Sequence, residues 1–93
     1  MIEVRETGTD DPMTFTVKVK EGGSHTTHNV TMSMASYKDL TGCKITPRRC
    51  MEAAFEYLLD RESKESILSS FDITVISRYF PRFRSEFGQY IPS

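Results

Sequence analysis

Alternation of apolar and polar residues dominates the first third of the chain. Met13, Phe15, Val17 and Val19 occupy every second position, with threonine and lysine between them. A period of two predicts a strand with one face packed on a core and the other in water. Alternating residues also precede and follow this run, and Gly22-Gly23 lies where a tight hairpin turn needs positive φ. We therefore expect a three-stranded antiparallel meander, with strands at about 2–6, 13–20 and 26–34.

A helical period replaces this alternation in the rest of the chain. Thr46 is a suitable N-cap, Pro47 fits the first helical position, and apolar residues follow at spacings of three and four. This pattern predicts the main helix at about 47–61. Shorter helical segments are expected from Ala35 to a stop at Gly42, after an N-cap at Asp72, and after Pro81. The predicted fold class is α+β, with three or four helices packed on one face of the sheet.

Length and charge narrow the possible functions. The chain has 93 residues, which suits a single small globular domain over 1–93, and its net charge is −1. Nucleic-acid binders are usually basic, so near-neutrality lowers that expectation. The N-terminus lacks the basic and apolar regions of a secretory signal, and no apolar run is long enough to cross a membrane. We therefore expect a cytoplasmic protein.

The sequence predicts no metal or cofactor site. His25, His28, Cys43 and Cys50 are residue types that bind zinc, but their spacing is not typical of a zinc site. Residues i and i+3 of a strand point to opposite faces, so the two histidines cannot readily reach one ion. A disulfide between the cysteines is possible in principle but unusual in a reducing cytoplasm. Both cysteines are interpreted as free thiols.

No catalytic constellation is evident either. The chain has only two histidines, both near the glycine hairpin, and no serine in a glycine-flanked elbow. The Gly22-Gly23 turn lacks the lysine and spacing of a phosphate-binding loop. We expect a non-enzymatic protein.

The C-terminal third combines aromatic residues with arginine. Six of the ten aromatic residues lie between Phe71 and Tyr90, interleaved with three arginines. Aromatic and arginine side chains are enriched in protein interfaces, so one interpretation is a partner-binding face. The other is that the phenylalanines form the core, as an apolar helical stripe usually does. The candidate partner-binding residues are Arg78, Tyr79, Arg82, Phe83, Arg84 and Tyr90.

Several partners remain open at this stage. The preferred hypothesis is a protein-interaction or accessory module with an unknown protein partner, or a homodimer formed by the same region or through a free sheet edge. The run from His28 to Arg61 superficially resembles a ribbon-helix-helix DNA-binding dimer, whose outward strand residues read the major groove. Thr27, Asn29, Thr31 and Ser33 would be those residues. That resemblance implies a small nucleic-acid-binding protein, but the third strand already has a hairpin partner upstream.

Overall fold

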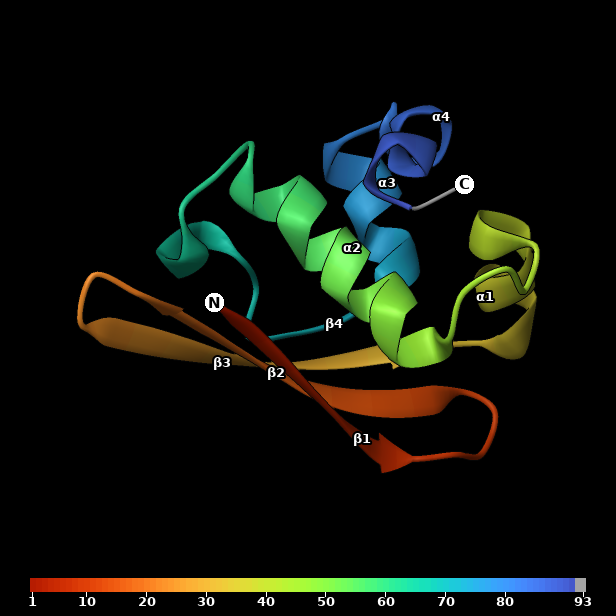
Figure 1. Ribbon diagram of the computed structural model, residues 1–93, viewed down its shortest axis with the longest axis horizontal. Helices are drawn as coiled ribbons and strands as arrows, with labels where there is room; N and C mark the ends of the chain where they lie inside the picture. The colour runs from red at the N-terminus through yellow and green to blue at the C-terminus, as the bar shows by residue number, and fades with distance from the viewer. Residues whose placement is uncertain (92–93) are drawn as a thin grey trace.

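The computed structural model describes residues 1–91 and consists of a sheet with helices on one of its faces (Figure 1). The α+β prediction is confirmed. The sheet has the order β1-β2-β3-β4. Its strands are β1 (Ile2–Gly8), β2 (Met13–Glu21), β3 (Ser24–Met32) and β4 (Ser70–Asp72). The α-helices are α1 (Met34–Thr41), α2 (Pro47–Leu59), α3 (Ile76–Tyr79) and α4 (Phe83–Glu86), and the 3-10 helices are η1 (Lys64–Ser66), η2 (Ile73–Val75) and η3 (Phe87–Tyr90).

The first three strands form the predicted antiparallel meander. Val4 pairs with Val17, and Phe15 pairs with Val30, so the apolar residues share the face that the helices cover. Gly22 and Gly23 have φ of 60° and 80° and close the β2–β3 turn. β3 begins two residues before the predicted 26 and ends two residues before the predicted 34. It ends early because the Ser33 hydroxyl accepts a hydrogen bond from the Ser36 amide and caps α1.

A fourth strand was not predicted. β4 is only three residues long and pairs in parallel with β3, with Val30 opposite Phe71. The Thr31 hydroxyl donates to the Asp72 carboxylate at 2.5 Å across this pair. The meander is therefore part of a mixed sheet, and α1, α2 and η1 make the connection between its two parallel strands.

The predicted helix signals act as expected. The Thr46 hydroxyl accepts from the Arg49 amide at 3.1 Å, and Gly42 ends α1 in the left-handed conformation with its amide donating to Lys38. The main helix ends at Leu59, two residues before the predicted boundary, because the Arg61 and Glu62 amides both turn back to the Leu58 carbonyl.

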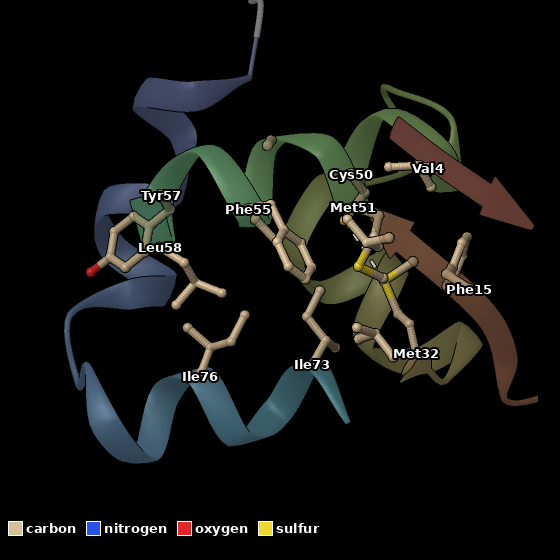
Figure 2. Packing of buried hydrophobic residues seen from close by; sticks show 14 of the residues in the cluster. Val4, Phe15, Met32, Cys50, Met51, Phe55, Tyr57, Leu58, Ile73 and Ile76 are labelled. Carbon is tan, nitrogen blue, oxygen red and sulfur yellow. Dashed lines mark hydrogen bonds between the residues drawn. The ribbon is translucent and has the colours of Figure 1, made fainter. Parts of the chain in front are cut away.

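One cluster of buried side chains joins the sheet to the helices. Figure 2 shows α2 between the strands and the η2–α3 segment, with Phe55 and Leu58 directed toward Ile73 and Ile76. Of the predicted stripe on α2, Met51, Ala54, Phe55 and Leu58 are all buried. Each buried aromatic side chain removes much apolar surface from water, so this small fold depends on them.

No helix in the described part of the chain covers the opposite face of the sheet (Figure 1). Polar side chains line it, among them Arg5, Thr16, Lys18 and Asn29. No helix within residues 1–91 is long and apolar enough to span a membrane.

Candidate partner-binding groove

The six candidate residues at the C-terminus do not form one surface. Phe83 is only 1% exposed and lies with Phe87 in the core, at a ring-centroid distance of 5.0 Å. It therefore cannot contact a partner in this conformation. The core interpretation holds for Phe83 and Phe87, whereas Tyr79 is 66% exposed.

Tyr90 takes part in an internal network around Arg61. The Arg61 guanidinium lies 3.6 Å from the centre of the Tyr57 ring, donates to the Tyr90 hydroxyl at 3.1 Å and pairs with Glu86 at 3.2 Å. The Tyr90 hydroxyl donates to Asp60 at 2.5 Å. Burial, followed by the hydrogen bond to Glu86, raises the pKa of Tyr57. These hydrogen bonds of Tyr90 hold the end of the described chain against α2.

Arg82 and Arg84 point to different parts of the molecule. Arg84 pairs with Asp39 of α1 at 2.7 Å, whereas Arg82 lines a hollow with Tyr57 and Glu86 on another side. Residues two apart on a helical turn lie about 200° apart around its axis, which explains the divergence of Arg82 and Arg84. Arg78 and Arg82 are exposed. Arg82 and Arg84 therefore do not converge into one basic patch.

Tyr79 forms one wall of an apolar groove between the end of α2, η1, β4 and α3. The groove has a volume of about 160 Å³. Leu68, which also lines the groove, is 45% exposed. The groove is thus flanked by two large apolar side chains that the core leaves in water, and we call it the Leu68 groove. Its lining comprises Leu58, Glu62, Ser66, Ile67, Leu68, Phe71, Val75, Ile76, Tyr79 and Phe80.

Several local interactions fix the walls of the Leu68 groove. The Asp72 carboxylate caps the η2–α3 segment by accepting from the amide and hydroxyl of Thr74, at 3.1 and 2.7 Å. Partial burial opposes ionisation of Asp72, but its hydrogen bonds from Thr31 and Thr74 outweigh burial, so its pKa lies below the ordinary value. On the other wall, the Leu68 carbonyl accepts from His28 Nδ1 at 2.7 Å.

Glu62 is the one acidic residue in the lining of the Leu68 groove. Partial burial raises the pKa of its carboxyl group, and burial is the only cause of this shift. Within residues 1–91, the Glu62 side chain makes no ion pair or hydrogen bond. The groove therefore combines an apolar lining with one uncompensated acidic group.

A second hollow adjoins the Leu68 groove on the far side of Tyr79. It has a volume of about 330 Å³, and Tyr57, Arg61, Pro81, Arg82 and Glu86 line it. Tyr79 and Phe80 line both hollows, so the exposed Tyr79 side chain stands on the ridge between them.

The two histidines lie on opposite faces of the sheet, as predicted. His25 is exposed, whereas His28 is 2% exposed on the helix-covered face. Because a carbonyl oxygen only accepts, His28 Nδ1 donates to Leu68, and in the neutral ring Nε2 accepts from the Thr26 hydroxyl at 2.8 Å. His28 thus joins β3 to the loop that carries Leu68.

The cysteines and carboxylates offer no metal site in the described part of the chain. No three His, Cys, Asp or Glu side chains among residues 1–91 are grouped to hold an ion. Cys43 is exposed and Cys50 is buried, and both are free. Burial raises the pKa of the Cys50 thiol to about 12, which keeps it protonated beside Met32 at neutral pH.

The ribbon-helix-helix comparison does not fit the sheet. In such a dimer the strand before the helices pairs with the same strand of a second copy. Here β3 pairs with β2 along its whole length and with β4 at residues 29–31. Ser33, one of the four proposed outward groups, is the N-cap of α1.

Sequence reasoning missed Glu62, Leu68 and Arg61. The groove residues come from five segments between Leu58 and Phe80, and β4, which brings these segments together, was not predicted. One available signal was Leu68 itself, an apolar residue within a serine-rich stretch. Comparison with protein-family models, curated proteins and solved structures found no match to this chain.

Proposed function

We propose that this protein is a non-enzymatic protein-interaction module that holds one large apolar side chain of a partner in the Leu68 groove. The observation that carries the proposal is the exposure of Leu68 and Tyr79, which both line one apolar hollow. In a chain of this size, large apolar side chains are needed for the core, so leaving two of them in water beside one groove favours an interaction site.

The size of the groove supports a side chain as its occupant. A volume of about 160 Å³ is close to that of an apolar cavity that holds a benzene-sized group. Pockets for cofactors and drug-sized ligands are larger, at about 300–1,000 Å³. A single leucine, methionine or phenylalanine side chain of a peptide matches the groove better.

The charge of the groove adds a second requirement. The Glu62 carboxylate lies among apolar side chains without a cation. A lysine or arginine next to the apolar anchor of the partner would pair with it in a partly desolvated setting, where ion pairs are stronger than in water. The proposed ligand is therefore a segment with a large apolar residue beside a basic one.

A displayed library of random peptides tests this proposal. We expect selection against the protein to enrich peptides with an apolar residue beside Lys or Arg, and fluorescence anisotropy then gives their affinity. Tyr79→Ala should weaken binding by roughly tenfold, because a truncated hot-spot residue costs more than about 1 kcal/mol. Arg84→Ala, on α4 and paired with Asp39, is the matched control and should bind normally. Peptides that bind Tyr79→Ala as tightly as the native protein would contradict the proposal.

Glu62→Gln separates the role of charge from that of shape. The folded pKa of Glu62 lies above its ordinary value, so its ionisation costs stability, and this cost appears as the pH rises through the folded pKa. We expect Glu62→Gln to be slightly more stable than the native protein at pH 7 and equally stable at pH 3. It should nevertheless bind basic peptides more weakly at pH 7. Urea denaturation and anisotropy at both pH values measure the two effects.

A small nucleic-acid binder is the alternative function. Arg5, Lys18 and Lys20 share the uncovered face of the sheet, which gives a surface that binds the nucleic-acid backbone some support. Glu3 pairs with Lys20 at 3.2 Å and reduces the local positive charge. Anisotropy of a labelled duplex and a labelled single strand distinguishes this function, because phosphate binding weakens steeply with salt.

We also propose a cytoplasmic location, since a reducing compartment suits two free cysteines.

A further inference from the structure

Within residues 1–91, the first strand leaves one edge of the sheet unpaired. In this part of the chain β1 is at the end of the strand order and pairs only with β2, and Figure 1 shows it at the margin of the sheet. Open edges present backbone donors and acceptors to any strand that can align with them. Which groups β1 presents follows from its pairing with β2.

Alternate residues of β1 direct their backbone groups toward the open edge. Met1 and Lys20 exchange two hydrogen bonds, each 2.8 Å long. Antiparallel pairs alternate between bonded and non-bonded positions, so Glu3 and Arg5 also bond to β2. The N–H and C=O groups of Ile2, Val4 and Glu6 therefore point away from β2.

This pattern restricts how two copies of β1 can pair in antiparallel fashion. Three central registers bring edge-facing residues opposite each other, and they are centred on Glu3, Val4 or Arg5. A register centred on Glu3 or on Arg5 places two identical charges directly opposite. The register centred on Val4 instead places Glu3 opposite Arg5 of the second copy, twice around the symmetry axis.

Charge thus selects one of the three registers. Opposite charges in directly opposed positions stabilise a strand pair, and like charges destabilise it. Glu3 and Arg5 are both exposed on the uncovered face of the sheet, where a second copy can reach them. The contact of Glu3 with Lys20, at 3.2 Å, leaves its carboxylate able to accept from a second cation.

We infer that β1 is a self-association edge at which two copies of this chain join their sheets about a twofold axis at Val4. Val4 bonds to Val4 of the second copy, Ile2 bonds to Glu6, and Glu3 pairs with Arg5. The contact is isologous, as expected for a twofold dimer, and lies on the sheet edge opposite β4 and the Leu68 groove.

Charge variants test this register directly. Sedimentation velocity over micromolar to millimolar protein should show a dimer for the native chain. Glu3→Arg and Arg5→Glu should each weaken it by roughly tenfold or more, since each turns both opposed pairs repulsive. An equimolar mixture of the two variants should regain native affinity, because every Arg then faces a Glu.

Two further variants identify the strand and the edge. Glu6→Pro removes an edge-facing N–H that β2 does not use, so it should abolish the dimer while circular dichroism stays native. Glu6→Ala keeps that N–H and should dimerise normally. Tyr79→Ala should leave the dimer intact, which separates this edge from the groove. A native chain that stays monomeric, or a mixture that associates no better than its components, would overturn the inference.

Discussion

Two groups of aromatic and arginine side chains meet at Phe80. In one of them, which we call the closed group, the polar atoms have partners inside the fold. Around Arg61, the rings of Tyr57 and Tyr90 have hydrogen-bonded or charged neighbours, and the Tyr57 ring lies 6.1 Å from that of Phe80. On the other side, Tyr79 stands in water between two hollows. The same residue types therefore stabilise the fold in one group and remain free to contact a partner protein in the other. The two groups differ in whether their side chains have partners inside the fold, and not in their amino-acid composition.

The largest expected effect comes from truncating Phe83, a core residue whose ring packs on Tyr57 of the closed group. Phe83→Ala should lower the free energy of unfolding by about 3–5 kcal/mol, the usual cost of removing a buried phenylalanine. Tyr79→Ala, four residues earlier and largely exposed, should change it by no more than about 0.5 kcal/mol. Urea denaturation followed by circular dichroism compares them. If both variants lost the same free energy of unfolding, the proposed difference between the closed group and the exposed Tyr79 side would be wrong.

An intermediate effect is expected for the arginine at the centre of the closed group. Arg61→Met keeps the apolar stem but removes the cation from Tyr57, Tyr90 and Glu86, and should cost about 1–2 kcal/mol. Arg82→Met, at an exposed arginine that lines the second hollow, is the matched control and should stay within about 0.5 kcal/mol of the native protein. Chemical denaturation measures both, and a native-like Arg61→Met would show that its contacts contribute nothing.

The smallest effect concerns the cap that holds the Tyr79 segment. The folded pKa of Asp72 lies below its ordinary value of 3.8, so its ionised form stabilises the fold above that value. Asp72→Asn should cost about 1 kcal/mol at pH 7, because Asn still caps but accepts without charge. The difference should shrink as the pH falls through the folded pKa. Asp10→Asn, in an exposed turn, serves as control, and a pH-independent difference would contradict the assignment.

Local signals in the sequence predicted the helix caps, the hairpin and the inward face of α2. Thr46, Pro47 and Gly42 act within one turn of their own position, so their effect can be read without the fold. β4 could not be found in this way, because three residues carry no period and its pairing with β3 spans about forty positions.

The candidate site was predicted only in part. Tyr79 was identified and lies on the groove, but the density of aromatic residues and arginine also selected Phe83, Tyr90 and Arg84. Phe83 is buried, Tyr90 donates a hydrogen bond to Asp60, and Arg84 pairs with Asp39. Exposure depends on how helical turns after Pro81 pack back on α2, and sequence spacing does not determine that packing.

The parallel pairing of β4 also has a consequence for biosynthesis. The amide of Asn29 donates to the carbonyl of Ser69 at 2.8 Å, and His28 donates to Leu68 beside it. A ribosome that has released β3 must add some forty further residues before these acceptors emerge. During that interval the middle of β3 has no strand beside it on this side, and the His28 ring lacks the carbonyl group that accepts from it in the fold. This edge of β3 is therefore open to misassociation until residues 68–72 emerge.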